Sequence, residues 1–318
     1  MNKRALKRLL TVSAVSFSCL WLSTEVLNKV WVQIRTEIEI SAYIQRLKGK
    51  DSTFRYLAAS ALERIGKEAV PALIAALKDD DQDVRSSAAS ALERIGKEAV
   101  PALIAALKDK DQNVRSGAAS ALGSIGKEAK AAVPALIVAL KDDDQNVRSA
   151  AAFALGSIGK EAVPALIAAL KDNNDAMVRS GAASALGRIG KEAVPVLIAA
   201  LKDKDQNVRS AAAFALGNIG KEAVPVLIAA LKDKDQNVRS GAASALGSIG
   251  KEAKAAVPAL IIALKDNDQE VRSSAAYALR GIGKEAKAAV PALIIALKDN
   301  DQEVRSSAAH ALRSIEKK

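Results

Sequence analysis

The stretch VPALIAALKDKDQNVRSGAASALGSIG, residues 100–126, decides the fold because it recurs along the chain with few changes. Each full copy contains one proline in the same place. The prolines recur about every 30 residues, a period typical of proteins that stack one supersecondary unit on the next. The eight prolines are Pro71, Pro101, Pro134, Pro164, Pro195, Pro225, Pro258 and Pro291.

Each unit contains two helical patterns. The first is predicted over residues 98–108, where apolar residues recur every three or four positions. Pro101 falls in its first turn, where no intrahelical hydrogen bond is lost. The second is predicted over residues 112–125, with Asp111 as its N-cap and Gly126 as its stop. Three units insert Lys-Ala-Ala before the proline, which lengthens a helix start or loop by about one turn.

These residues carry a resemblance to a known repeat. Pro-Ala-Leu-Ile in the first helix and Asp-x-x-Val-Arg-x-x-Ala-Ala-x-Ala-Leu in the second resemble the HEAT repeat. The units are shorter than the usual HEAT length of roughly 40–47 residues, so the chain is most similar to the short units of the bilin-lyase-like (PBS lyase) subgroup. The resemblance implies an all-α, right-handed α-solenoid of about nine HEAT-like helix pairs over residues 38–316. Residues 40–47 read as a degenerate first helix with Ser41 in place of proline.

The N-terminal residues differ from the repeats. A basic start followed by the apolar residues 9–22 predicts a signal peptide or a membrane anchor over residues 1–22, although a spanning helix usually needs about 20 apolar residues. We therefore expect an exported or membrane-anchored protein, with a cytoplasmic location as the alternative. Residues 23–37 form an amphipathic pattern that predicts a helix capping the first unit, with Trp31 as a packing residue.

Composition limits the classes of partner. Of the net charge of +11, residues 1–50 contribute +6, from nine Lys/Arg and three Asp/Glu. The remaining +5 is spread over residues 51–318, where lysine and aspartate alternate in the loops. Nucleic-acid surfaces use clustered basic residues and stacking aromatics, and aromatics are only 3% of this chain. No nucleic-acid partner is predicted, and Cys19, the one cysteine, excludes an intramolecular disulfide.

The second helix predicts where a partner binds. A step of about 100° per residue places Val114, Ala118 and Leu122 in the core and Ser120 and Ser124 opposite them. The core positions hardly change between units, whereas the exposed ones do. The HEAT resemblance implies that these exposed positions line the concave face. The candidates for binding a partner there are Tyr56, Arg64, Arg94, Phe153, Arg188, Phe214, Asn218, Tyr277, Arg280, His310 and Arg313.

Two interpretations stay open at this stage. Phe153 and Phe214 are either exposed binding residues or packing between adjacent helices. Arg115 recurs at the same position of every full unit, and either bonds loop aspartates of neighbouring units in a ladder or captures anions. The absence of variation favours the ladder.

The chain lacks the residues that common enzymes need. It has one histidine and one cysteine, His310 and Cys19, which lie at opposite ends of the chain. Neither a catalytic His-containing pair nor a His/Cys zinc site is expected, and no cofactor is predicted. Deoxyhypusine hydroxylases, HEAT-repeat enzymes that bind iron through paired His-Glu motifs, are disfavoured because those motifs are missing.

The leading hypothesis is a non-enzymatic, monomeric scaffold that binds a protein or peptide on its concave face. The alternative, implied by the PBS-lyase resemblance, is an accessory in bilin attachment to phycobiliproteins.

Overall fold

A computed structural model describes residues 24–172 and 175–316. The predicted signal or anchor over residues 1–22 and Cys19 lie outside these ranges. Helices connected by short turns make up the described residues, which contain no strand. The all-α repeat architecture predicted from the proline period is thereby confirmed. The chain divides into two compact units, with the boundary between Ala132 and Val133.

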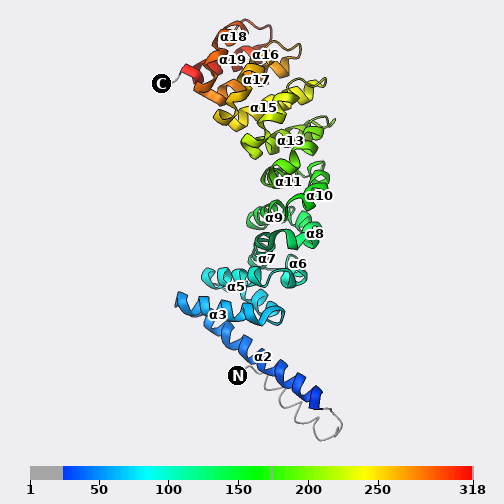
Figure 1. The fold of residues 1–318 in the computed structure, drawn as a ribbon, viewed down its shortest axis with the longest axis vertical. Coiled ribbons are helices and arrows are strands. Elements are labelled where there is room, and N and C mark those ends of the chain that lie inside the picture. The colour runs from blue at the N-terminus through cyan, green and yellow to red at the C-terminus, as the bar shows by residue number, and fades with distance from the viewer. Residues whose placement is uncertain (1–23, 173–174, 317–318) are drawn as a thin grey trace. The chain divides into compact units, whose positions relative to one another are not determined.

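The first compact unit begins with a long helix and continues with alternating short and long ones (Figure 1). Its α-helices are α2 (Thr24–Leu47), α3 (Ser52–Ile65), α4 (Val70–Ala76), α5 (Gln82–Ile95), α6 (Val100–Ala106) and α7 (Gln112–Ile125). The 3-10 helices η1 (Gly66–Ala69), η2 (Gly96–Ala99) and η3 (Gly126–Ala132) precede the prolines.

The second compact unit repeats the same alternation six times. Its first helices are α8 (Val133–Ala139), α10 (Val163–Leu170), α12 (Val194–Ala200), α14 (Val224–Ala230), α16 (Val257–Ala263) and α18 (Val290–Ala296). Its second helices are α9 (Gln145–Ile158), α11 (Ala176–Ile189), α13 (Gln206–Ile219), α15 (Gln236–Ile249), α17 (Gln269–Ile282) and α19 (Gln302–Glu316). Their 3-10 helices are η4 (Gly159–Ala162), η5 (Gly190–Ala193), η6 (Gly220–Ala223), η7 (Gly250–Ala256) and η8 (Gly283–Ala289).

Local capping sets the bounds of the second helices. The Asp111 carboxylate accepts a hydrogen bond of 2.8 Å from the Asn113 amide at the start of α7, as an N-cap does. Gly126 ends the helix with a φ of +68°, a conformation that side chains disfavour. Both predicted ends are confirmed. The first helix is shorter than predicted, because residues 96–99 form a 3-10 turn and the α-helix begins at Val100.

The Lys-Ala-Ala insertions extend the turn before the first helix. The 3-10 helix η2, Gly96–Ala99, has four residues, whereas η3, η7 and η8 each have seven. The helices that follow keep the same length of seven residues. An insertion therefore lengthens the connection between two repeats and leaves both helices of the pair unchanged.

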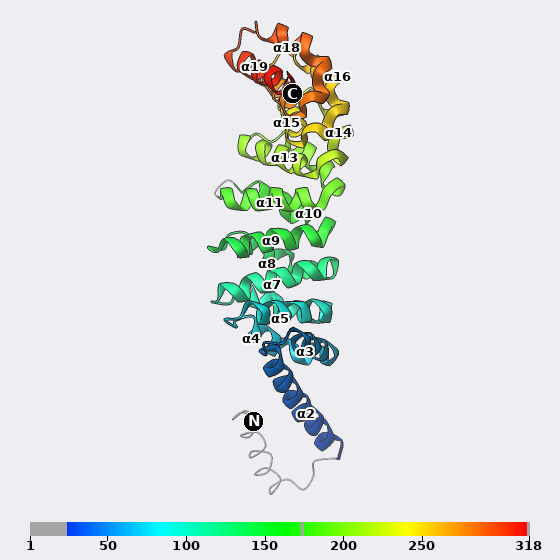
Figure 2. The same ribbon diagram turned by 90° about the vertical axis from the view of Figure 1, so that its left-hand side faces the viewer.

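The core lies between a layer of first helices and a layer of second helices. Figure 2 shows the two layers in residues 133–316, with α14, α16 and α18 in one and α9, α11 and α13 in the other. The predicted core residues Val114, Ala118 and Leu122 are fully buried, as is Ala119 on the helix flank. The small side chains of Ala118 and Ala119 let consecutive second helices approach closely.

The N-terminal helix differs from its prediction. The helix α2 is one continuous element, whereas the sequence divided it between a cap over residues 23–37 and the first repeat. No glycine or proline interrupts it, and i,i+4 ion pairs such as Arg35 with Glu39 at 3.0 Å support it. The prediction that Trp31 packs is wrong, since its side chain is 61% exposed. Only the C-terminal part, with Ile40 and Leu47 buried, packs on the described repeats.

Two stretches, Gln145–Leu170 and Gln206–Ala230, are long and apolar enough to cross a membrane. Each joins a second helix to the next first helix, and Gly159 or Gly220 with a positive φ separates the two. Their apolar residues contribute to the buried core of the repeats. Length and composition alone are therefore weak support for a membrane span.

Candidate protein-interaction site

All eleven residues predicted to bind a partner have exposed side chains. Tyr56, Arg64 and Arg94 lie on the second helices of the first compact unit. The other eight lie on second helices of the second compact unit, from α9 to α19. Their exposure fits the face assigned from the helical period. Three hollows on this face bring some of them together and leave others apart.

The first hollow lies over α13, α15, α17 and α19 and has a volume of about 440 Å³. Phe214 and Tyr277 line it, with side chains 50% and 44% exposed. The Tyr277 ring lies against Gly247 of the preceding second helix, where a Cβ would come within 2.7 Å of the ring. Serines make up half of the remaining lining: Ser210, Ser240, Ser244, Ser248, Ser273, Ser274 and Ser307.

A second hollow of about 580 Å³ lies over α9 and α11. The Arg188 guanidinium carbon lies 4.2 Å from the centre of the Phe153 ring, a cation–π arrangement. The arginine stem crosses Gly156, where a Cβ would come within 2.5 Å of it. Phe153 is 37% exposed, so this ring is both part of the surface and part of the packing between neighbouring repeats. The contact with Arg188 supports the packing interpretation for this residue, and partner binding by its exposed part stays a prediction.

The third hollow, of about 520 Å³, lies over α3 and α5 in the first compact unit. Arg94 lies over the Tyr56 ring, 5.6 Å from its centre. The same guanidinium forms an ion pair of 3.1 Å with Glu63 and donates a hydrogen bond to the Ser60 hydroxyl. An arginine from one repeat thus stacks on an aromatic ring of the preceding repeat in both compact units.

Five candidates line none of these three hollows: Arg64, Asn218, Arg280, His310 and Arg313. Asn218 lies against Gly187 of the preceding second helix, in the place where a Cβ would clash. The Arg280 backbone carbonyl accepts a hydrogen bond from the Ser314 hydroxyl, which links α17 to α19. These residues are exposed, but the geometry does not group them with the aromatic rings.

The sequence reasoning missed residues at the position equivalent to Asn113. Met177 lines the hollow with Phe153, and Glu270 and Glu303 line the hollow with Phe214. The signal was available, because asparagine holds this exposed position in the repeats between Asn113 and Asn237 except at Met177. The two glutamates outnumber Arg209 in the hollow over α13–α19, which has a net negative charge, whereas Arg148 and Arg188 make the one over α9 and α11 basic.

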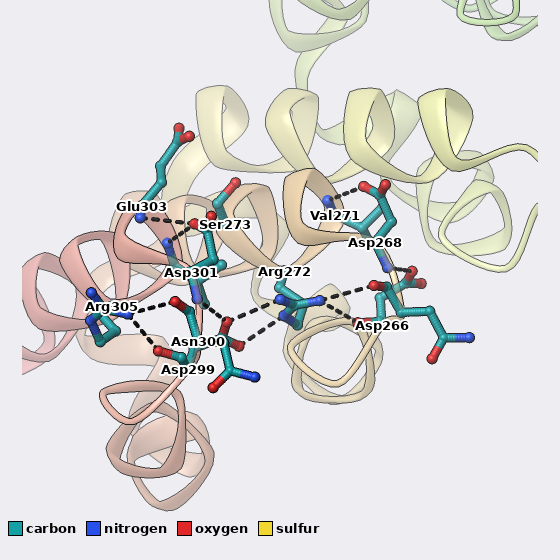
Figure 3. A network of polar contacts seen from close by, with 12 residues as sticks. Asp266, Asp268, Val271, Arg272, Ser273, Asp299, Asn300, Asp301, Glu303 and Arg305 are labelled. Carbon is teal, nitrogen blue, oxygen red and sulfur yellow. Dashed lines mark hydrogen bonds and ion pairs between the residues drawn. The ribbon is translucent and has the colours of Figure 1, made fainter.

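The recurring arginine has a structural role that the ladder interpretation describes in part. Arg115 donates hydrogen bonds of 2.9 and 3.0 Å to the backbone carbonyls of Asp109 and Lys110, in the loop before its own helix. Two equivalents also reach the next repeat: Arg239 binds the Asp266 carboxylate and Arg272 binds that of Asp299, each through two nitrogens. Figure 3 shows Arg272 between the two aspartates.

The ion pairs lower the pKa of both aspartate carboxylates. The Arg272 guanidinium holds the pKa of Asp299 below its ordinary value, although partial burial opposes it. Burial raises the pKa of Asp266, but hydrogen bonds from Arg239 and from the Asp268 amide outweigh that effect and lower it. The charges of Asp266 and Asp299 thus stabilise contacts between neighbouring repeats. Among the described residues, no three His, Cys, Asp or Glu side chains gather in a way that could hold a metal ion.

Helix pairs that repeat about every 30 residues and stack into two layers define the class of α-solenoid repeat proteins. The family model for HEAT repeats matches residues 40–100, 96–137, 133–204, 194–280 and 257–318. The chain therefore belongs to the HEAT-repeat family.

Several solved structures are similar to the chain. An engineered protein is 29% identical, with 87% of this chain and 89% of that one covered and a TM-score of 0.33. The complex of CpcE and CpcF of phycocyanin lyase from Nostoc is 26% identical over 48% of this chain and 98% of that one, with a TM-score of 0.38. Human deoxyhypusine hydroxylase is 27% identical over 82% of this chain and 99% of that one, with a TM-score of 0.32. No curated protein matches the chain.

Proposed function

We propose that this chain is a non-enzymatic scaffold that binds a protein or peptide segment along the second helices of residues 133–316. The observation that carries the proposal is the half-exposed Phe214, in a hollow where serine is the most frequent lining residue. Other repeats have serine at the position of this ring, for example Ser120, Ser184 and Ser244. A repeat therefore does not need the ring to fold, and an exposed aromatic side chain in a hollow is a common anchor for a partner.

The surface around the ring supports a partner of some length. A stack of repeats presents neighbouring second helices side by side, so that one segment can contact several of them. The hollow over α9 and α11 is basic through Arg148 and Arg188. The hollow over α13–α19 has a net negative charge, because Glu270 and Glu303 outnumber Arg209. A partner segment with acidic residues at one end and basic residues at the other would match both, which would fix the direction in which it lies.

A non-enzymatic role is supported by the chain's own residues. The single histidine, His310, is an exposed residue on the last helix, and it lines none of the three hollows. The paired His-Glu motifs of the iron-binding HEAT-repeat hydroxylases are missing from the sequence. We propose that residues 1–22 export or anchor the protein, which would place the scaffold at or outside a membrane, and that the repeats act as a monomer.

The proposal is tested by site-specific photo-crosslinking in the full chain. A benzophenone amino acid at Ser244, inside the hollow, should capture a partner protein from the native host, whereas one at Ala168, on the first helices, should not capture it. The double variant Phe214→Ser and Tyr277→Ser should reduce the captured amount at least tenfold. Serine is already accepted at the equivalent positions, so circular dichroism should show an unchanged fold. Equal capture by the variant and the parent chain would contradict the proposal.

A further inference from the structure

The first-helix layer of the second compact unit contains a separate exposed apolar surface. Ile262 on α16 is 70% exposed and Ile295 on α18 is 66% exposed. The position equivalent to Ile262 is exposed in the other repeats too, but there it is alanine wherever the repeat lacks the Lys-Ala-Ala insertion. The alanines are Ala75, Ala105, Ala168, Ala199 and Ala229. Core packing does not explain isoleucine at a position that faces solvent.

The large residue occurs where the chain has its insertion. The three repeats with Lys-Ala-Ala before the proline carry Val138, Ile262 and Ile295 at this position, and the five repeats without it carry alanine. The inserted turns η7 and η8 do not cover the isoleucines, as their exposure shows. The apolar side chain is therefore a surface feature that accompanies the insertion.

The insertion also changes which cation binds the loop aspartate. Without an insertion, the lysine at the end of a first helix pairs with the aspartate of the next repeat, as Lys171 does with Asp203 at 3.2 Å and Lys202 with Asp233 at 3.3 Å. With an insertion, an arginine takes that aspartate. Arg239 binds Asp266 at 2.8 Å, and Arg272 binds Asp299 at the same distance (Figure 3).

The exchange takes the aspartates away from Lys232 and Lys265, and Lys298 lies in the last described repeat. Lys232, Lys265 and Lys298 are exposed, and among the described residues none of them forms an ion pair. The Lys265 amide bonds the Ile262 carbonyl at 3.0 Å and the Lys298 amide bonds that of Ile295 at 3.0 Å. Each lysine thus follows its isoleucine by one turn and lies on the same side of the first-helix layer.

Two hollows lie between consecutive first helices at this surface. The one between α14 and α16, of about 730 Å³, includes Ile262, Lys232 and Lys265. The one between α16 and α18, of about 480 Å³, includes Ile295, Lys265 and Lys298. The aspartates that also line these hollows, Asp233, Asp266 and Asp299, are each neutralised by a pair within the repeats. Apolar hollows with unpaired positive charge at their rims remain.

We propose that this surface, formed by Ile262, Ile295, Lys232, Lys265 and Lys298, binds an acidic amphipathic helix of a partner protein. Adjacent packed helices lie about 8–10 Å apart, and residues seven apart on a helix lie about 10.5 Å apart. A helix laid across α16 and α18 can therefore place apolar side chains at i and i+7 against both isoleucines. Its glutamates would then face the unpaired lysines. The surface belongs to the first-helix layer and is separate from the hollow with Phe214.

The test uses the full chain and a labelled 21-residue helical peptide with leucine at every a and d position, glutamate at every e and g position and glutamine elsewhere. Fluorescence anisotropy should show binding that weakens as salt rises. The same peptide with glutamine for glutamate should bind at least tenfold more weakly. Ile262→Ala with Ile295→Ala should weaken binding of the glutamate peptide at least tenfold. Lys265→Gln with Lys298→Gln should weaken binding of the glutamate peptide only.

The controls separate this partner from other occupants. Val226→Ala removes an exposed valine of a first helix that lies outside the surface and should leave binding unchanged. The alanine variants restore the residue found in five other repeats, and circular dichroism checks their fold. Equal affinity for both peptides, or unchanged binding by the isoleucine double variant, would overturn the proposal. A dimer in sedimentation that the isoleucine double variant abolishes would also overturn it. So would binding to anionic lipid vesicles that this variant abolishes, if the peptide does not bind.

Discussion

Gly281 provides the sharpest test of how the second helices pack. A Cβ at Gly281 on α17 would overlap the Gly247 carbonyl oxygen of α15 and lie 3.0 Å from its carbonyl carbon and 3.2 Å from its Cα. These are backbone atoms, which move only if the helix moves. The position equivalent to Gly281 has a side chain in every other repeat, for example Ser248 and Ser314. The α15–α17 pair is therefore closer than a pair that accommodates a side chain.

Replacing Gly281 with alanine should destabilise this pair despite a better helix propensity. Alanine in a helix gains roughly 1 kcal/mol over glycine. Overpacking costs about 1–3 kcal/mol, and the upper end applies because the atoms overlapped belong to a backbone. The expected net loss is about 2 kcal/mol. A loss of about 1.4 kcal/mol already changes an equilibrium constant tenfold, so amide exchange in α15 and α17 should accelerate by more than tenfold.

Hydrogen exchange is the appropriate measurement because repeat arrays can open locally, which makes a single unfolding free energy ill defined. Gly241→Ala is the matched control. Its new Cβ would meet the end of the Leu201 side chain, 2.6 Å away, and other repeats have Ala150 and Ala211 at this position. Its exchange should be unchanged or slower. If the amides of α15 and α17 exchange as slowly in Gly281→Ala as in the parent chain, a Cβ at this position does not disturb the backbone contact.

Three further outcomes are expected. Asp299→Asn should cost about 1–3 kcal/mol at neutral pH, since it removes a hydrogen-bonded ion pair with Arg272. Because the pKa of Asp299 is lowered in the folded state, this stabilisation is complete above the ordinary carboxyl pKa and is lost as pH falls through the folded-state value. Hydrogen exchange in α17 and α19, compared between the variant and the parent chain at each of several pH values, should therefore show the two converging in acid, and a constant difference would contradict the assignment. Co-expression with a bilin and an apo-phycobiliprotein should give no bilin adduct, and a coloured product would support the lyase alternative. Removal of residues 1–22 should leave a soluble helical protein, whereas aggregation would indicate that they belong to the fold.

The parts of the fold that depend on residues close together in the sequence were predictable. The second helix of the reference repeat begins after Asp111 and ends at Gly126 because a cap and a left-handed glycine act locally. Trp31 was mispredicted because its burial depends on how α2 lies against other elements. A helical period assigns a face to a residue, but it does not say whether anything covers that face.

The candidate site was predictable to the same extent. The period placed Phe153, Phe214 and Tyr277 on the exposed face correctly. Arg188 over Phe153 was not predictable from one helix, since the contact crosses to the next repeat. The isoleucines of the first helices escaped notice because an apolar residue in an apolar helix resembles core until its exposure is known.

The ion pairs between repeats have a consequence for how the gene can change. Several of them connect the lysine after a first helix to the same aspartate position of the following repeat, as Lys171 to Asp203 and Lys202 to Asp233. Residues 97–126 and 221–250 differ only at Ala102 and Val226. Recombination between such near-identical stretches would remove or duplicate whole repeats and still present an aspartate to the lysine of the preceding repeat. The protein can thus change length in whole steps without passing through an ill-matched junction.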